Sequence, residues 1–285
     1  MTVAAAARGD GHEAYRGEML VAVDEARVLG NPGEPRLRFV EGSKDAGTWR
    51  GPRLLTVDDA PAFELSNWCG TCQFLFQRLD GATTTFSPDG PDGTAELDDQ
   101  LIARFAALLP EGLYQPLLLQ VRPRLVRPSG PGDYFAEEQI STWGLESFWG
   151  LPAYPRTPYY RTFETAVDAG AHLYEFVVPM VPPSWNEPDR VADHAAELSG
   201  GAMPTAVAVA ILDVCAPAVA NGPDYHSHWA LTHFLLDGHH RMQAAAETGR
   251  PLRLLSLLAV DAGLAEPEQI ARLPSVRAAA PRARG

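Results

Sequence analysis

The chain has 285 residues, of which 46% are hydrophobic, so it can bury a sizeable core and is not a disordered protein. Its formal net charge of −13, from 36 acidic and 23 basic residues, argues against binding nucleic acid through clustered Lys and Arg. No apolar run reaches the length of a membrane-spanning helix, so neither a membrane nor a nucleic acid is expected as a partner.

Residues 1–14 are small and polar, and we expect them to form a disordered tail. They lack the long apolar core of a signal peptide. The three cysteines of the chain, Cys69, Cys72 and Cys215, are too few for a disulfide scaffold. Together these features predict a cytoplasmic protein in a reducing compartment.

Residues 15–170 read as an α+β region whose role the sequence does not indicate. Apolar patterning predicts strands at Met19–Val23, Arg36–Val40, Arg53–Val57 and Leu117–Val126, and helices at Trp68–Leu79 and Leu97–Leu109. Pro123 inside the last of these strands favours a sheet edge or a bend. The residues from Tyr134 to Pro158 are rich in aromatic side chains and receive no assignment.

Residues 171–263 show a clearer alternation of strands and helices, which predicts an α/β unit with a soft domain boundary near Gly170. The expected strands are Leu173–Val181, Ala206–Leu212, Leu231–Leu236 and Leu252–Val260, and the expected helices are Asp189–Leu198 and His239–Thr248. Residues 264–285 are expected to form a short helix, Glu266–Leu273, and a basic tail.

The strongest functional signal is the pentapeptide Asp237-Gly238-His239-His240-Arg241, which joins a predicted strand to a predicted helix. Such a turn exposes the first amide groups of the helix and its positive dipole end, which together bind anions. Gly238 permits a tight turn, and Arg241 can grip phosphate oxygens with two hydrogen bonds. His239 and His240 can donate hydrogen bonds or transfer a proton. The alternative interpretation is that Asp237 only caps the helix and both histidines lie on the surface.

A family resemblance rests on the helix Arg190–Leu198, the tripeptide Met203-Pro204-Thr205 and the segment Phe234–Arg241 with Ala244 after it. These residues resemble the ParB/sulfiredoxin-like superfamily, which carries Gly-x-x-Arg-x-x-Ala at a strand-to-helix junction that holds nucleotide phosphates. The Asp-Gly-His-His-Arg version is most similar to the nucleotide-dependent free-serine kinases of that superfamily. The resemblance implies a ParB/sulfiredoxin-like nucleotide-binding domain over residues 171–263.

Two departures narrow what the resemblance implies. Sulfiredoxins carry a catalytic cysteine just after the glycine, where this chain has His239. Partition proteins continue into a helix-turn-helix region, whereas only a short helix and a tail are expected after Gly263. Sulfiredoxin chemistry and DNA partitioning are therefore not expected.

By the resemblance, Glu187 in Trp185-Asn186-Glu187-Pro188 takes the place of a catalytic glutamate, and this chain would be a nucleotide-dependent phosphotransferase with a small hydroxyl-bearing substrate. His240 and Arg241 would steady the transferring phosphoryl group of ATP or ADP, and Asp237 would help to hold Mg²⁺. Glu187 as a solvated acid at a helix start is an equally weighted interpretation. A non-catalytic nucleotide-binding switch or partner-binding protein is the alternative function, and no oligomeric state is predicted.

A second motif, Cys69-Gly70-Thr71-Cys72, allows three interpretations. It is a redox pair, or half of a Zn²⁺ site completed by His226 and His228 in a zinc-dependent enzyme, or an inert structural pair. His226 and His228 precede the phosphate strand and either line the same pocket or belong to a polar loop, the latter being slightly favoured.

Overall fold

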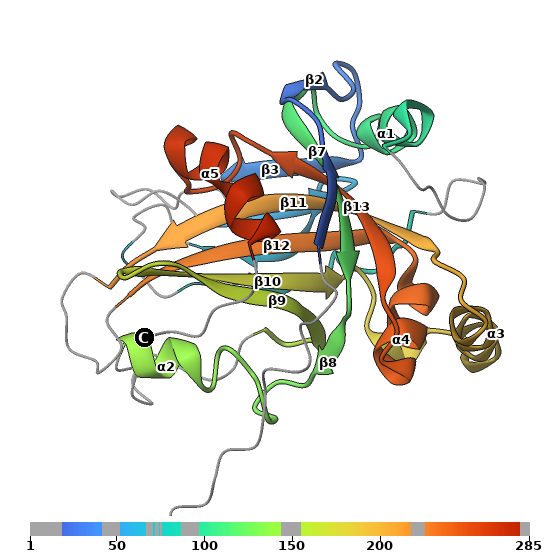
Figure 1. Ribbon diagram of the computed structural model, residues 1–285. Coiled ribbons are helices and arrows are strands. Elements are labelled where there is room, and N and C mark those ends of the chain that lie inside the picture. Colours follow the sequence, from blue (N-terminus) through green and yellow to red (C-terminus); the bar gives the residue numbers. More distant parts are fainter. Residues whose placement is uncertain are drawn as a thin grey trace, which may run out of the picture.

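The structure is a computed structural model, and it describes residues 19–41, 52–66, 71, 74, 76–86, 97–143, 155–217 and 226–279. These residues form a mixed α/β fold with a nine-stranded mixed sheet, a four-stranded antiparallel sheet and five α-helices (Figure 1). The predicted α/β class is confirmed at this level.

The nine-stranded sheet runs through the middle of the molecule in the order β1-β7-β13-β11-β12-β10-β9-β8, with β2 beside β7. Its strands are β1 (Met19–Val23), β2 (Arg27–Leu29), β7 (Gly112–Val121), β8 (Arg124–Val126), β9 (Tyr159–Asp168), β10 (Ala171–Pro179), β11 (Thr205–Cys215), β12 (Ser227–Asp237) and β13 (Leu252–Ala259). The pairs β10–β12 and β11–β13 are parallel, and the other pairs are antiparallel. The central strands are apolar on both faces because both faces of the sheet are covered.

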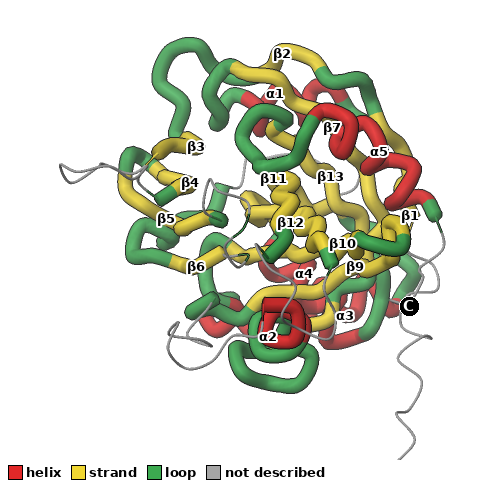
Figure 2. The backbone as a smooth tube through the Cα atoms, turned by 90° about the vertical axis from the view of Figure 1, so that its left-hand side faces the viewer, coloured by secondary structure: helices red, strands yellow, loops and turns green. Residues whose placement is uncertain are grey.

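The four-stranded sheet covers one face of the large sheet (Figure 2). It consists of β3 (Leu37–Glu41), β4 (Arg53–Val57), β5 (Ala60–Leu65) and β6 (Phe76–Arg78). Apolar side chains from both sheets meet in one core, where for example the rings of Phe63 and Phe234 contact each other at a tilt, with centroids 5.0 Å apart. The buried Arg53 of β4 also forms an ion pair with Asp213 of β11, at 3.0 Å between Nη1 and Oδ1.

Helices cover the other face and the ends of the large sheet. They are α1 (Asp99–Ala106), α2 (Glu138–Trp143), η3 (Pro183–Trp185), α3 (Pro188–Ser199), α4 (His239–Thr248) and α5 (Pro267–Ala278). Met242 and Ala245 of α4 and Leu273 of α5 join the second core on this face. Figure 1 shows α3 and α4 packed against each other beside the end of the sheet.

Most strands and helices that the sequence predicts after Gly170 are confirmed, with shifted ends. The bend at Pro123 is also confirmed, because β7 ends at Val121 and the chain turns there into β8, which pairs with β9 instead of continuing the pairing of β7 with β13. The helix predicted over Trp68–Leu79 is wrong within the described residues. Phe76 lies in β6, paired with Leu65 of β5, because its ring packs into the core between the two sheets.

Two further differences concern the regions flanking the predicted α/β unit. Gly170 lies in the turn between β9 and β10, and these two strands are paired, so the sheet continues across the expected domain boundary. The last helix extends past Pro274 to Ala278, where the sequence predicts a tail. It continues because Arg277 is buried against Glu175 of β10, with Nε 2.7 Å from Oε2.

Candidate functional site

The predicted phosphate turn joins β12 to α4, as expected. Gly238 has φ +87°, in the left-handed region that glycine adopts without strain. A Cβ atom at this position would lie 2.8 Å from Cβ of Ala206 and 3.0 Å from its Cα, so the turn rests directly on the start of β11. A glycine is therefore required here for both conformation and packing.

The N-terminus of α4 presents its first amide groups at this turn. The first intrahelical bond runs from the amide of Met242 to the carbonyl of Gly238 at 2.8 Å, so the amides of His239 and His240 precede it. The N-cap residue of α4 is Gly238, which has no side chain that could form a capping bond. The interpretation of two surface histidines is wrong for His239, which is only 4% exposed.

A polar pocket of about 280 Å³ lies over the turn. Its lining consists of Thr83, Thr85, Val181, Trp185, Asn186, Glu187, Arg190, His194 and the whole segment Asp237–Arg241. The pocket is at the carboxyl ends of the parallel neighbours β10 and β12, which is where ligands of α/β sheets commonly bind. The structure thus brings together Glu187 and all five residues of the predicted phosphate turn.

The side chain of His239 connects the β12–α4 turn to Met180, directly after the end of β10. Its Nε2 accepts a hydrogen bond from the amide of Met180 at 3.2 Å, which assigns the ring proton to Nδ1 in the neutral imidazole. Burial, assisted by the nearby His240, lowers the pKa of His239 to about 3. The side chain is consequently neutral at physiological pH.

His240 connects α4 to the start of α3. Its Nε2 accepts a hydrogen bond from the amide of Glu187 at 3.1 Å, and burial together with Arg190 lowers its pKa. Next to it, the amide nitrogen of the Asn186 side chain lies 2.7 Å from Oε1 of Gln243 and 3.3 Å from the carbonyl of His239. These bonds hold the Glu187 backbone beside the Asp237–Arg241 turn.

The carboxylate of Glu187 lies at the mouth of the pocket. Its side chain is 69% exposed, and its Oε1 is 3.8 Å from Nη1 of Arg190. It does not cap α3, although Glu187 is the residue before the first helical residue, Pro188. The carboxylate can therefore approach a bound substrate without first breaking a capping bond.

Arg241 is held in place by the protein itself. Its Nη1 donates a hydrogen bond to the carbonyl of Thr205 and lies 3.6 Å from Oδ2 of Asp237. A guanidinium near the positive end of a helix dipole needs a nearby acceptor, and Asp237 and Thr205 supply it. The position of Arg241 thus has a structural explanation, and its grip on a phosphate remains a prediction.

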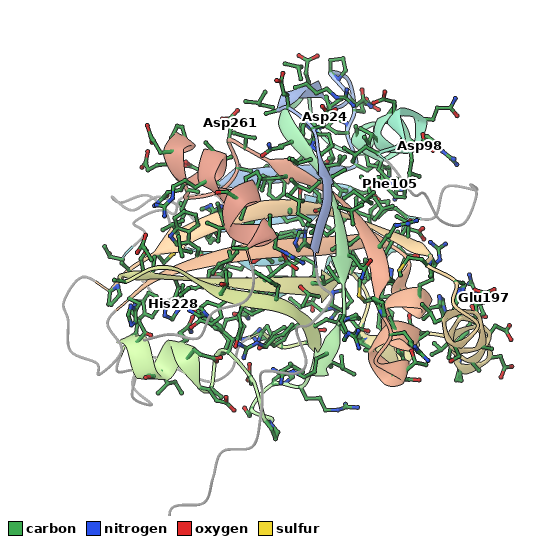
Figure 3. The ribbon with its side chains drawn as sticks, in the orientation of Figure 1. Asp24, Asp98, Phe105, Glu197, His228 and Asp261 are labelled. Carbon is green, nitrogen blue, oxygen red and sulfur yellow. The ribbon has the colours of Figure 1, made fainter. Side chains whose placement is uncertain are left out.

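His226 and His228 do not line this pocket. His228 lies near the start of β12, roughly 30 Å from Asp237 at the strand's other end on the ordinary rise per residue. Figure 3 shows His228 beside α2, at the opposite end of the sheet from Glu197 on α3. The interpretation as a polar loop is also wrong for His228, because it is fully buried in β12.

The buried ring of His228 is hydrogen-bonded at both nitrogens. Nδ1 is 2.6 Å from the hydroxyl of Tyr134, and Nε2 is 2.8 Å from the hydroxyl of Thr142. In this arrangement His228 offers no nitrogen to Zn²⁺. Cys69 and Cys72 lie outside the described residues, and within those residues no group of three or more His, Cys, Asp and Glu side chains is placed to hold a metal.

The pocket also contains residues for which the sequence predicts no role. Thr83 and Thr85 lie on a loop that reaches β12 from far away in the sequence, where the amide of Phe86 bonds the carbonyl of Leu236 at 2.8 Å. No local pattern marks them, because this contact forms only in the folded chain. Trp185 and Arg190 lie close to Glu187 in the sequence. This closeness to a candidate catalytic residue is the one feature of the sequence that could have indicated them as pocket residues.

A scan of protein-family models, a search of curated proteins and a search of solved structures each returned no match. In the part of the chain that the structure describes, no helix has the length and apolar character needed to cross a membrane.

Proposed function

We propose that this pocket binds the phosphates of a nucleotide and that the protein is a nucleotide-dependent phosphotransferase acting on a small hydroxyl-bearing substrate. The observation that carries the proposal is the convergence of the Gly238 turn, the N-terminus of α4 and the Glu187 carboxylate in one polar pocket. An anion site next to an exposed carboxylate is the arrangement that phosphoryl transfer to a hydroxyl requires.

The proposal includes membership of the ParB/sulfiredoxin-like superfamily. Three features support it: the element order β10, α3, β11, β12, α4, β13, the left-handed Gly238 at the junction, and Arg241 three residues later. The free-serine kinases are the branch whose Asp-Gly-His-His-Arg turn this chain shares, and ATP or ADP is the corresponding phosphate donor.

The chemistry can be assigned to residues of this pocket. The amides of His239 and His240 and the guanidinium of Arg241 bind the transferring phosphoryl group. The N–H dipoles and the guanidinium charge stabilise the negative charge that spreads over its oxygens. Glu187 takes the proton from the substrate hydroxyl as that oxygen bonds to phosphorus and the bond from phosphorus to the nucleotide's bridging oxygen breaks. His240 acts mainly by holding the Glu187 backbone through the 3.1 Å hydrogen bond.

The pocket has donors of the kind that Mg²⁺ prefers. Asp237 and Glu187 both line it, and Mg²⁺ is commonly held by one or two carboxylates together with substrate phosphates. Asp237 would help to hold the ion, which would neutralise phosphate charge, and Glu187 would stay free of the ion to act as the base. No Zn²⁺ role is proposed, because both nitrogens of His228 are hydrogen-bonded within the core.

One observation favours the alternative of a nucleotide-binding switch or partner-binding protein. The Glu187 carboxylate is 69% exposed and faces Arg190 at 3.8 Å, a position that a surface acid at a helix start can also occupy. In that case the turn binds nucleotide without transferring its phosphate.

Two substitutions test the proposal by calorimetry and by phosphotransfer assays. Arg241→Ala is expected to weaken nucleotide binding by about 1–3 kcal/mol, the scale of a charge-assisted hydrogen bond. Glu187→Gln is expected to leave nucleotide binding nearly unchanged and to abolish transfer, because a general base acts mainly in the transition state. His194→Gln is the control, since it changes a pocket-lining residue that has no assigned role.

Three results would count against the proposal. If Arg241→Ala binds every nucleoside di- and triphosphate as tightly as the parent, the guanidinium does not bind phosphate. If Glu187→Gln retains full transfer, another residue is the base. If the parent binds nucleotide but transfers phosphate to no hydroxyl compound, the switch function is correct.

A further inference from the structure

Among the described residues, Trp185 is the large aromatic residue that is exposed at the surface. Its side chain is 57% exposed, and the other exposed large hydrophobic residues among those described are three valines of β1 and β2. Exposed tryptophan is uncommon, because its indole has a large apolar surface to bury. Trp185 also lines the phosphate pocket, so its exposed ring faces a site and not only bulk solvent.

The indole is held in a defined orientation by its surroundings. Trp185 ends the 3-10 helix η3, where its amide bonds the carbonyl of Pro182 at 2.9 Å and two prolines stiffen the backbone. The guanidinium of Arg78 lies over the ring, with Cζ 5.6 Å from the ring centroid. Arg78 is itself fixed by a 2.6 Å hydrogen bond to the carbonyl of Ala82, on the loop that carries Thr83 and Thr85.

The pocket is small for a whole nucleotide. A volume of about 280 Å³ is at the small end for sites that bind organic ligands. It accommodates phosphates at the Gly238 turn, while the remainder of a nucleotide must extend toward the rim. Trp185 provides at that rim a rigid aromatic surface, which stacks with any base because each base has a π-face.

We propose that Trp185 is the stacking platform for the base of the bound nucleotide, with purines preferred over pyrimidines. This inference rests on the proposed function, because it assumes phosphates at the β12–α4 turn. The preference follows from ring area, since a purine covers more of the indole than a pyrimidine does. Thr83, Thr85 and Asn186 offer hydroxyl and amide groups along the wall between the turn and the ring.

The test compares ligands with and without a base on three forms of the full-length protein. Calorimetry measures the binding of ADP, CDP and inorganic pyrophosphate to the parent, Trp185→Ala and Trp185→Phe. The parent is expected to bind ADP more tightly than CDP or pyrophosphate. Trp185→Ala is expected to lose about 5- to 150-fold in ADP affinity, the scale of one base–aromatic stack, and to keep its pyrophosphate affinity. Trp185→Phe retains an aromatic ring and is expected to lose much less.

Indole fluorescence gives a second readout that does not depend on activity. ADP is expected to quench part of the parent's emission, pyrophosphate is not, and the ADP effect is expected to disappear in Trp185→Phe. If pyrophosphate and ADP bind the parent but Trp185→Ala keeps its full preference for ADP, or loses both ligands equally, stacking on Trp185 is wrong while the phosphate site can stand. If the parent binds neither ligand, the proposed function itself is wrong.

Discussion

At the scale of single residues, the β12–α4 turn depends on a glycine and a histidine with different tasks. Gly238 lets the chain adopt φ +87° against Ala206, which no larger side chain permits. His239 fills the space beneath the turn and accepts the Met180 amide through Nε2. The sequence predicts that this side chain donates a hydrogen bond to phosphate or transfers a proton. In the structure its ring points into the core and stabilises the turn from inside.

The neutral, buried state of His239 predicts a pH-dependent stability. The unfolded chain takes up a proton on this residue below its ordinary pKa of 6.5, whereas the native protein does so only near a pKa of about 3. Unfolding is therefore favoured as pH falls through this interval, by up to about 1.4 kcal/mol per pH unit for this one group. Urea denaturation of the parent between about pH 6.5 and pH 5 is expected to show the loss.

His239→Gln separates this contribution from those of other groups. Gln keeps an acceptor for the Met180 amide but does not titrate, so the free energy of unfolding should depend less on pH than in the parent.

Glu175 contributes little to the pH dependence of stability between about pH 6.5 and pH 5. Burial alone would raise its pKa, but Arg277 and His233 lower it from 4.5 to about 2, so its loss of stability begins only below pH 4.5. If the free energy of unfolding falls equally steeply with pH in the parent and in His239→Gln, the prediction is contradicted.

At the scale of elements, α5 is attached to the large sheet by a buried ion pair. Arg277 is 2% exposed and Glu175 is fully buried, and Nε of the guanidinium lies 2.7 Å from Oε2 of the carboxylate. The hydroxyl of Thr162 donates a further hydrogen bond to Oε1 at 2.7 Å. This attachment, together with Leu273 in the apolar core, explains why the helix continues beyond Pro274.

Removing one partner of this pair is expected to be strongly destabilising. Arg277→Met leaves the Glu175 carboxylate buried without its cation, which costs about 3–5 kcal/mol in comparable cases. The double variant Arg277→Met/Glu175→Gln also removes the buried charge and should recover part of that loss. Chemical denaturation of the two variants measures both effects.

Arg272→Ala is the matched control on the same helix. Its salt bridge to Asp168, at 3.2 Å, joins two half-exposed side chains, and such pairs contribute about 0–1 kcal/mol. A loss for Arg277→Met no larger than that for Arg272→Ala would show that α5 is not anchored through Glu175.

At the scale of the whole molecule, strands from both halves of the chain form one sheet. The strands that follow Gly170 are flanked on both sides by strands that precede it. On one side β7 pairs with β13, and on the other side β9 pairs with β10. The four-stranded sheet, which comes entirely from the first half, covers one face. The pocket over the β12–α4 turn likewise takes Thr83 and Thr85 from the first half.

A fragment of residues 171–279 is therefore expected not to fold on its own. It would expose the apolar face that the four-stranded sheet covers and leave the edges of β10 and β13 unpaired. Circular dichroism during heating should show no cooperative transition, in contrast to the full chain measured in parallel. A sharp transition with native-like near-UV signals would show instead that the boundary near Gly170 separates two domains.

Local patterns in the sequence determined the elements whose signal lies within a few neighbouring residues. The alternation after Gly170 predicted β10, α3, β11, β12, α4 and β13, because apolar periodicity and terminating Gly or Pro residues are local properties. The Asp237–Arg241 turn was predictable for the same reason, since strand, glycine and helix start are adjacent in the chain.

Tertiary structure decided what depends on contacts between distant residues. Phe76 became part of a strand because aromatic rings between the two sheets pack around it, although the local spacing suggested a helix. Arg277 extended a helix because Glu175 lies opposite it, and the pocket gained Thr83 and Thr85 because their loop pairs with the end of β12. These outcomes follow from burial and pairing energies that arise only when separate segments meet, so no local pattern contains them.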